Sequence, residues 1–409
     1  MKQHLVQLRR GKSMNMKHNQ IWAGTLIAAL LCGLSLQAHS AGDPLEQASY
    51  MTAKASSAMM LGVVQSKGRF IEVGEHGVIN YSDNQGATWI QARVPVSVTL
   101  TAVTCTPEGT IWAVGHDGAV ISSSDNGVSW TRRLDGNQAN SLMQLQAKRR
   151  AELAHKALDA ANPANKAVAQ RESDESDNAL ADIEAAAKFG PSRPLLGVWF
   201  KNENDGLVIG SYGQIFHTSD GGRNWESYAT RLKNKDGLHY NAISATRAGN
   251  VLIAGEGGQV YRSTDGGANW QALNTGYQGQ LYGALGAVDG KGNEMLIAFG
   301  FGGHVFHSTA GSDHWSEMVS ATQKNLVAGM ILPDGTVELV GQDGSVIRSD
   351  RDLTVFHQVL PGSGLALAGA TQITPGRKLI AVGAGGAHTL DPAEDNADGN
   401  VSHTGKIQP

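Results

Sequence analysis

Short apolar runs that carry almost no charge recur along the chain and predict the buried strands of a repeated β-structure. They are LGVV at 61, LTAVTC at 100, LLGVWF at 195, YNAISA at 240, GALGAV at 283, LVAGMI at 326 and LALAGA at 365. A strand buried on both faces shows no polar alternation, so each run is interpreted as the innermost strand of one unit. A second apolar run and a more alternating third run follow each of them, as in TIWAVG at 110 and AVISSS at 119.

A Gly-x-x-Gly turn separates the second and third runs of every unit. The seven turns are Gly74/Gly77, Gly115/Gly118, Gly210/Gly213, Gly255/Gly258, Gly300/Gly303, Gly341/Gly344 and Gly383/Gly386. Successive turns are 41, 95, 45, 45, 41 and 42 residues apart. A period in the low forties with four short strands per unit is typical of a β-propeller. We therefore expect one all-β domain, a seven-bladed β-propeller over residues 41–390.

A second turn, of the form Ser/Thr-x-Asp-x-Gly-x-x-Trp, follows the third run in most units and is called here the Asp turn. Its acidic or amide residues and tryptophans are Asn84 and Trp89, Asp125 and Trp130, Asp220 and Trp225, Asp265 and Trp270, and Trp315. The last of these units has Ala310 in place of Asp, and the sixth unit, near 350–356, hardly keeps the pattern. A short carboxylate accepts hydrogen bonds from nearby backbone N–H groups, and glycine permits a positive φ, which predicts a structural role. The alternative is a metal site, but one Asp per blade gives no ligand cluster, so we expect no metal and no cofactor.

The one long interval contains a helical insertion over about 137–190, between blades 2 and 3. It is rich in Ala, Leu, Gln, Lys and Glu, begins with a Ser141-x-x-Gln144 capping box and is broken at Asn162-Pro163. Its first half carries Lys148, Arg149, Arg150 and Lys156, and its second half carries Glu172, Asp174, Glu175, Asp177, Asp182 and Glu184. The charges predict a helical hairpin whose two arms attract each other. An arm that binds a partner is the alternative.

Residues 1–40 have the order of an export signal. Five basic residues precede an apolar run over 21–36, and Ala38-His39-Ser40 makes a small-x-small cleavage site before Ala41. The apolar run is too short for the alternative, a membrane anchor. Removal of the segment leaves 28 basic against 37 acidic residues, a net charge of about −9, so nucleic acid is not an expected partner. We expect a periplasmic or otherwise exported protein.

The structures of the two ends of the mature chain are predicted from the strand that the seventh unit lacks. That unit has no Asp turn and no fourth strand of its own before residue 391. Residues 44–60 are expected to supply this outer strand, and residues 391–409 are expected to form a disordered tail. Only Cys105 remains after cleavage, inside the LTAVTC run, which indicates a buried thiol and no intramolecular disulfide.

The units ending in V-G-x-x-G-x-I-x-x-S-x-D-x-G-x-x-W resemble Asp-box (bacterial neuraminidase-type) repeats, and most of all the photosystem II stability and assembly factor family. The resemblance covers nearly all of residues 58–390 outside the insertion. It implies a non-enzymatic, monomeric scaffold of the thylakoid lumen or periplasm, peripheral to the membrane at most, that binds or helps to assemble a membrane protein complex. Exported relatives in bacteria without photosynthesis imply a transporter as partner. Photosynthetic members carry an arginine patch, whereas Arg69, Arg93, Arg223, Arg262 and Arg348 do not fall in one matching motif.

The alternative function is a glycoside hydrolase, because Asp-box propellers also include sialidases and xyloglucan-type enzymes. Glycoside hydrolysis generally requires two carboxylates, or a tyrosine nucleophile with its partners, near the central axis. The seven innermost runs contain no Asp, Glu, Arg or His, and no Phe/Tyr-Arg-Ile-Pro tetrapeptide occurs. The sequence therefore favours a protein that is not an enzyme.

The Gly-x-x-Gly turns are the predicted working surface. In an up-and-down blade the turn between strands two and three lies on the same face as the connection to the next blade, so the insertion is expected to overhang these turns. Their variable positions are the candidate partner-binding residues: Glu75, His76, His116, Asp117, Tyr212, Glu256, Phe301, Gln342 and Asp343. Loops on a rigid scaffold are where binding residues concentrate.

Overall fold

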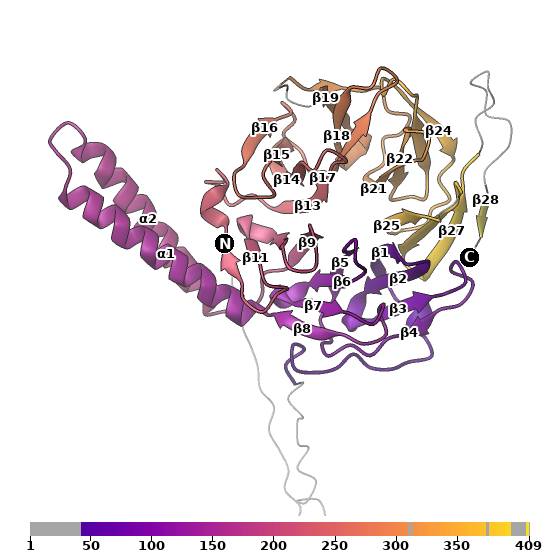
Figure 1. The fold of residues 1–409 in the computed structure, drawn as a ribbon, viewed down its shortest axis with the longest axis horizontal. Helices are drawn as coiled ribbons and strands as arrows, with labels where there is room; N and C mark the ends of the chain where they lie inside the picture. The colour runs from indigo at the N-terminus through magenta and orange to yellow at the C-terminus, as the bar shows by residue number, and fades with distance from the viewer. Residues whose placement is uncertain (1–41, 310–311, 313, 374–375, 394–405, 409) are drawn as a thin grey trace, which may run out of the picture. The chain divides into compact units, whose positions relative to one another are not determined.

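Seven four-stranded antiparallel sheets make up the folded part of the chain (Figure 1). The structure, a computed structural model, describes residues 42–309, 312, 314–373, 376–393 and 406–408. The predicted export signal over 1–40 lies outside the described residues. Among those residues, no helix is both long enough and apolar enough to cross a bilayer. The expected seven-bladed propeller with a helical hairpin between blades 2 and 3 is confirmed.

Every sheet takes its four strands in chain order, from the channel outward. The strands of blades 1 to 4 are β1 (Met60–Ser66), β2 (Arg69–Gly74), β3 (Ile79–Ser82), β4 (Ile90–Gln91); β5 (Leu100–Cys105), β6 (Ile111–Gly115), β7 (Val120–Ser123), β8 (Thr131–Leu134); β9 (Leu195–Phe200), β10 (Gly206–Gly210), β11 (Ile215–Thr218), β12 (Glu226–Ser227); β13 (Tyr240–Ala245), β14 (Val251–Gly255), β15 (Gln259–Ser263) and β16 (Gln271–Asn274). Those of blades 5 to 7 are β17 (Leu281–Val288), β18 (Glu294–Gly300), β19 (Val305–Thr309), β20 (Ser316–Glu317); β21 (Leu326–Ile331), β22 (Val337–Gly341), β23 (Val346–Ser349), β24 (Phe356–Leu360); β25 (Leu367–Gln372), β26 (Leu379–Gly383), β27 (Gly386–Asp391) and β28 (Lys406–Gln408).

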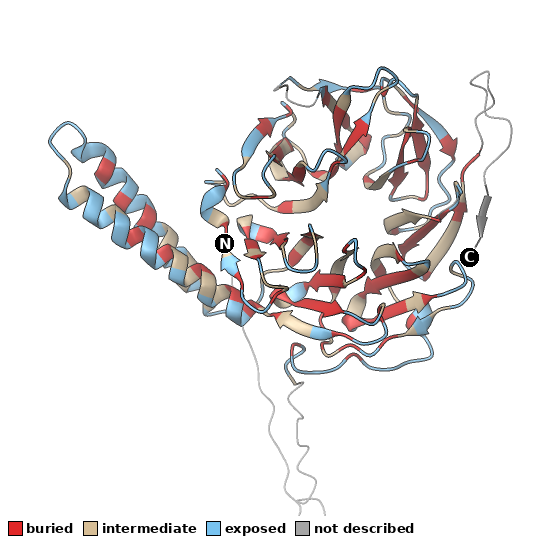
Figure 2. Cartoon of the chain, in the orientation of Figure 1, coloured by how far each residue is buried: buried red, intermediate tan, exposed pale blue. Residues whose placement is uncertain are grey.

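The innermost strands close into a ring. Each of β1, β5, β9, β13, β17, β21 and β25 contacts the next, and β25 contacts β1. The second strand of each blade is the most buried one, as the red ribbons of Figure 2 show, because both of its faces pack against neighbouring blades. One core cluster fills each seam between blades; Ile71 and Val73 of β2, for example, pack with Ile111 and Ile121 of blade 2.

Blade 7 is completed by the end of the chain, which corrects the prediction for residues 44–60. The outer strand β28 pairs with β27, with Leu390 opposite Ile407. Of the predicted disordered tail over 391–409, residues 394–405 and 409 lie outside the described residues, while 406–408 form this strand. A strand formed from either end of the chain satisfies the exposed edge of β27 equally well, so composition could not distinguish the two.

Residues 44–59 instead line the rim of blade 1, and Met60 begins the innermost strand β1. The Ser49 amide donates to the Val94 carbonyl (3.0 Å), and the Gln91 side chain exchanges hydrogen bonds with the backbone of residues 50 and 52 (2.9 Å each). A short 3-10 helix, η1 (Ala55–Ser57), then contacts both β3 and β27. The N-terminal segment therefore covers the seam between blades 7 and 1 without joining a sheet.

The insertion forms two antiparallel helices, α1 (Gly136–Asp159) and α2 (Lys166–Ala187). The capping box lies at Asp135 and Gln138 rather than at Ser141 and Gln144, because Asp135 directly follows β8 and its carboxylate accepts from the amides of residues 137 and 138 (3.0 Å each). The predicted break at Asn162-Pro163 falls between the helices. Ala147, Ala151 and Ala169 are buried between the arms, and the pairs Lys148–Glu184 (3.5 Å) and His155–Asp177 (2.9 Å) join them.

Candidate functional site

The Gly-x-x-Gly turns have one backbone conformation in five of the blades, and it explains both glycines. Each forms one 3-10 turn: η2 (Glu75–Gly77), η3 (His116–Gly118), η4 (Ser211–Gly213), η6 (Glu256–Gly258) and η7 (Phe301–Gly303). The last glycine has a positive φ, for example 70° at Gly77, which favours glycine. The first glycine is extended, but a side chain at Gly74 would meet the Met59 carbonyl oxygen at 2.2 Å. The second glycine is thus required by the turn and the first by the approach of the incoming chain.

The turns lie on the face where the chain enters each blade. In all seven blades the residue after the first glycine donates its N–H to a carbonyl just before the innermost strand. The donor–acceptor pairs are Glu75–Met59, His116–Thr99, Ser211–Pro194, Glu256–His239, Phe301–Gln280, Gln342–Asn325 and Ala384–Ala366. This confirms that the turns and the connections between blades share one face, called here the Gly-turn face.

Several candidate residues are engaged within the fold. The Glu75 carboxylate accepts from the Met59 amide (2.9 Å), and the Glu256 carboxylate accepts from the His239 amide (3.1 Å). Asp343 accepts from the amide and the hydroxyl of Ser345 (3.1 and 2.7 Å). Glu75 and Glu256 hold the entering chain in place and Asp343 closes its own turn, so the presence of these carboxylates has a structural explanation. Burial raises the pKa of Asp117, the fourth acidic candidate, whose backbone packs closely against Gly136.

The remaining candidates present their side chains to solvent. His76, His116 and Gln342 are exposed, as are Tyr212 (60% exposed) and Phe301 (52% exposed). Tyr212 has a φ of 58°, at a position where blades 4 and 5 have Gly257 and Gly302. A non-glycine residue in this conformation is strained by roughly 1 kcal/mol, so tyrosine here makes the fold less stable than glycine would. The same conformation occurs at His76 (52°) and Asp117 (54°), the equivalent positions of blades 1 and 2, so the strain belongs to the turn and Tyr212 differs in its exposed aromatic ring.

A cavity of about 500 Å³ opens at the mouth of the central channel, and all seven blades contribute to it. Its wall is apolar at Leu61, Leu196 and Val327, and polar at Asn241, Tyr282 and Asn325. Two of the amides are oriented by hydrogen bonds: Asn241 donates to the Leu281 carbonyl (2.9 Å) and Asn325 donates to Gln342 (3.0 Å). The prediction of site residues omitted these positions, although Asn241 and Tyr282 interrupt otherwise apolar runs.

The channel mouth carries no charged side chain among its described lining residues. It therefore offers no pair of carboxylates for glycoside hydrolysis. Within the described part of the chain, no three His, Cys, Asp or Glu residues come together as a metal site. An uncharged cavity lined by a few oriented amides is suited to binding an uncharged stretch of polypeptide.

The Asp turns lie at the opposite end of the sheets, between the third and fourth strands. Asp220 accepts from the Arg223 and Asn224 amides (3.0 and 2.9 Å) and from the Thr218 hydroxyl (3.0 Å). The hydrogen bonds from Asn224 are the main reason that the pKa of Asp220 falls to about 2. Asn84, Asp125 and Asp265 accept hydrogen bonds in the same way, from Thr88, Ser129 and Asn269.

The weak sixth copy of this turn nevertheless keeps its hydrogen bonds. Asp350 accepts from the amide and the hydroxyl of Thr354 (2.7 and 2.6 Å) and from the Val355 amide (3.3 Å). The spacing of four residues between the acceptor and its donor is the signal that could have revealed it. The turn thus keeps its hydrogen bonds although the glycine and the tryptophan of the pattern are missing.

The tryptophans of the Asp turns pack against the preceding blade. Trp225 of blade 3 meets the ring of Trp112 of blade 2 edge-on, with centroids 6.4 Å apart, and donates to the Arg133 carbonyl (3.2 Å). Trp130, Trp270, Trp315 and Trp89 lie in the seam clusters with blades 1, 3, 4 and 7. Trp130 and Trp225 are buried, whereas the other three are half-buried.

The hairpin reaches only part of the Gly-turn face. Helix α1 contacts η3 of blade 2 and β12 of blade 3, and Gln146 donates to the Ser227 carbonyl (2.7 Å). Beyond these contacts the hairpin projects outward from the rim, so the expectation that it overhangs the ring of turns is wrong (Figure 1). The buried side chains Ala139 and Met143 at the start of α1 set this direction, because they pack into the cluster between blades 2 and 3.

Three of the five arginines that were compared with the arginine patch of photosynthetic members have separate environments. Arg348 is buried against Glu338 (Nε to Oε1, 2.8 Å), and Arg69 pairs with Asp83 (2.7 Å). Arg262 donates to the Gln271 side chain (2.8 Å).

Comparisons with known proteins agree with the repeat structure. Residues 185–354 match the family described as photosynthesis system II assembly factor YCF48. A solved structure described as YCF48 bound to D1 peptide is 15% identical, with a TM-score of 0.54, covering 81% of this chain and 92% of that one. YCF48 from Cyanidioschyzon merolae is 14% identical, with a TM-score of 0.54, covering 83% and 97%. A search of curated proteins finds no match.

At such identities the solved structures show the fold alone, and the family match is limited to residues 185–354, in blades 3 to 6. The resemblance to the photosystem II assembly factor YCF48 family is thereby confirmed for residues 185–354, the part of the chain that matches its model.

Proposed function

We propose that this protein is an exported, non-enzymatic scaffold that binds a segment of a membrane protein complex on its Gly-turn face. The observation that carries the proposal is the YCF48 family domain over 185–354. A propeller of similar fold has been solved bound to a peptide of another protein, D1, which supports a polypeptide as ligand. The bound complex is a photosystem in a photosynthetic cell or a transporter elsewhere.

The chemistry of the face supports a polypeptide ligand. The channel mouth combines aliphatic side chains with Asn241 and Asn325, whose amide groups can hydrogen bond to a peptide backbone. Tyr212 and Phe301 lie on the same face as exposed aromatic residues. Aromatic side chains at a surface commonly provide much of the binding energy in protein complexes.

A pull-down of the mature protein from its native envelope tests the proposal. Tyr212→Gly removes the aromatic ring and installs the residue that blades 4 and 5 have, so it should reduce partner recovery without lowering the melting temperature. Phe301→Ala should also reduce recovery. The matched control is Gln85→Gly, because Gln85 is exposed on the Asp-turn face with a φ of 57°.

The identity of the recovered protein distinguishes the two proposed kinds of partner, a photosystem and a transporter. Photosystem subunits in the recovered fraction would support a photosystem as partner, and a transporter in that fraction would support a transporter. Full recovery with both Tyr212→Gly and Phe301→Ala would contradict binding through this face. Hydrolysis of aryl glycosides by the purified protein would overturn the non-enzymatic assignment.

A further inference from the structure

A groove runs between the hairpin and blade 3, outside the channel mouth. Three adjoining hollows of about 530, 620 and 660 Å³ compose it, and all three include Arg150 of α1 and Lys235 of the loop between β12 and β13. At one end it reaches Tyr212, and at the other it reaches Ala157. From Met143 to Ala157 the helix rises roughly 20 Å, enough for an extended peptide of about six residues.

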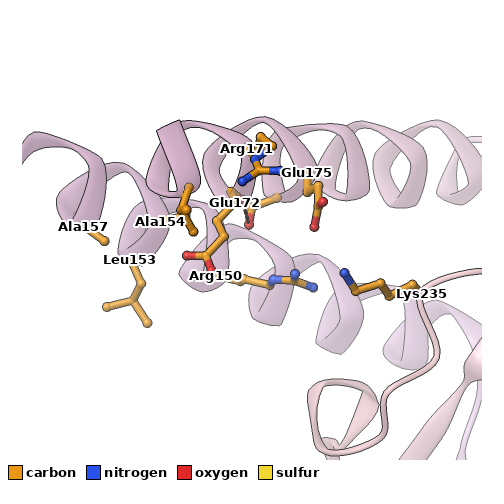
Figure 3. Close-up of a pocket in the computed structure, with 10 residues that line it drawn as sticks. Arg150, Leu153, Ala154, Ala157, Arg171, Glu172, Glu175 and Lys235 are labelled. Carbon is orange, nitrogen blue, oxygen red and sulfur yellow. Dashed lines mark hydrogen bonds between the residues drawn. The ribbon is translucent and has the colours of Figure 1, made fainter. Parts of the chain in front are cut away.

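Two cations converge in this groove. Figure 3 shows the Arg150 guanidinium and the Lys235 ammonium pointing toward each other in one hollow, on the side opposite α2. Neither makes an ion pair within 4.0 Å among the described residues, although Glu172 and Glu175 of α2 line the same hollow. Like charges that face each other are stabilised by an anion placed between them.

A third cation lies at the propeller end of the groove. Arg193 is half-buried between Met143 and the exposed ring of Tyr212, with its guanidinium carbon 5.3 Å from the ring centroid. Burial lowers the pKa of Arg193, which reflects the cost of holding a charge there. Asp182 partly opposes this effect from a distance, but no carboxylate of the described residues lies within 4.0 Å of Arg193. An incoming carboxylate in direct contact would offset more of the cost.

The opposite wall of the groove has the other sign of charge. Helix α2 contributes Glu172, Glu175 and Asp182 and one cation, Arg171, so this wall is acidic on balance. On the other side α1 contributes Arg150, and the connections on either side of blade 3 contribute Arg193 and Lys235. Between them the floor is formed by small or apolar side chains such as Ala147, Ala179 and Ile183. In an extended chain successive side chains point to opposite sides, so only every second residue of a bound segment faces the basic wall.

We propose that this groove binds an extended segment of a partner protein in which acidic residues occupy alternate positions. The acidic side chains contact Arg193, Arg150 and Lys235, and the intervening residues, which face α2, are not acidic. The inference rests on the proposed scaffold function and adds a second, charge-selective contact to it. Tyr212 belongs to both surfaces, which makes the groove continuous with the Gly-turn face.

Fluorescence anisotropy on the full mature chain tests this inference. The probe is a fluorescein-labelled hexapeptide of alternating glutamate and alanine, and the comparison probe has glutamine in place of glutamate. The glutamate probe should bind more tightly, and its affinity should fall as salt is added. Loss of a charge-assisted contact in Arg193→Gln, or in Arg150→Gln combined with Lys235→Gln, should weaken binding by about tenfold or more.

Arg149→Gln is the matched control, because Arg149 is exposed on the same helix and does not line the groove. It should leave the affinity of the glutamate probe unchanged. Because Arg150 and Lys235 are exposed, their double variant should fold normally. It therefore tests the groove even if Arg193→Gln does not fold. Equal binding of both probes, or an Arg150/Lys235 variant that binds like Arg149→Gln, would overturn the inference. Partner recovery that depends on Phe301 but not on Arg150 and Lys235 would leave the proposed function standing and reject the groove.

Discussion

At the scale of single residues, a buried carboxylate distinguishes two otherwise equivalent blades. Glu72 of β2 lies opposite Asn80 of β3, and Glu338 of β22 lies opposite Arg348 of β23. Both carboxylates are fully buried. Glu338 has the guanidinium of Arg348, whereas Glu72 accepts, among the described residues, only from the Asn80 amide (2.7 Å). Blade 1 therefore buries a carboxyl group that has no cation beside it in the part of the chain that the structure describes.

This difference predicts a pH-dependent stability. Burial raises the pKa of Glu72 from 4.5 to about 7, against a smaller opposing effect of the Asn80 hydrogen bond. The folded protein then binds the extra proton between these values, so the contribution of Glu72 to the free energy of unfolding falls by on the order of 3 kcal/mol as pH rises through this window. Glu72→Gln should remove that loss and raise the melting temperature at pH 8 relative to the parent protein.

The exposed residue Glu108 supplies the control, since Glu108→Gln should not change how the melting temperature varies with pH. A Glu72→Gln protein whose melting temperature still fell between pH 5 and pH 8 as much as that of the parent would contradict the assignment.

Trp225 supports a second prediction at this scale. It is buried edge-on against the stacked rings of Trp112 and Phe200, with both centroids 6.4 Å away, in the seam between blades 2 and 3. Trp225→Ala should lower the free energy of unfolding by about 3 to 5 kcal/mol through the cavity it leaves. Chemical denaturation measures this loss; a smaller loss is expected for Trp270→Ala, because Trp270 is only half-buried. Equal losses would show that burial in the seam is not the cause.

At the scale of elements, the hairpin is joined to the propeller by few contacts at its base. Ala139 and Met143 pack into the seam between blades 2 and 3, and Gln146 bonds to Ser227. Farther along α1, the buried Ala151 packs against α2. The propeller and the outer part of the hairpin should therefore be separable.

Replacing residues 138–189 by a short Gly-Ser linker should leave a folded propeller with a lower melting temperature, since Ala139 and Met143 are lost. Replacing only 152–174 by a short turn should leave the melting temperature nearly unchanged. Calorimetry compares the two. An unfolded protein after the shorter replacement would show that the outer hairpin contributes to the propeller fold.

At the scale of the whole molecule, the ring is closed by contact between β25 and β1, and the chain enters and leaves at the same seam. The N-terminal segment over 43–58 is part of the folded unit, because η1 packs on both β3 and β27. Processing before residue 41 is compatible with this arrangement, since it leaves that segment intact.

Export therefore remains a prediction that can be tested directly. Mass spectrometry of the mature protein should find an N-terminus at or near Ala41, in an envelope or periplasmic fraction. A terminus at Met1 or Met16 in a cytosolic fraction would contradict export with cleavage. Cleavage downstream of Ala55 would also be inconsistent with the structure, because it would remove the contacts of η1.

The sequence by itself determined the number of blades, the position of the insertion and the form of both turns. These features depend on residues close together in the chain: apolar runs, glycines with a positive φ, and an Asp that accepts from amides four residues later. Local pattern is therefore enough to predict them, and the structure agrees on the seven sheets and the two helices.

Only the tertiary structure decided which distant residues meet. It assigned the outer strand of blade 7 to β28, engaged Glu75 and Glu256 within the fold, and directed the hairpin outward with a groove beside blade 3. It also placed Glu72 in a seam without a cation among the described residues, and Trp225 against the preceding blade. The physical reason is common to all of these. Each is a contact between segments far apart in the chain, whose partners depend on how blades close and pack rather than on neighbouring residues.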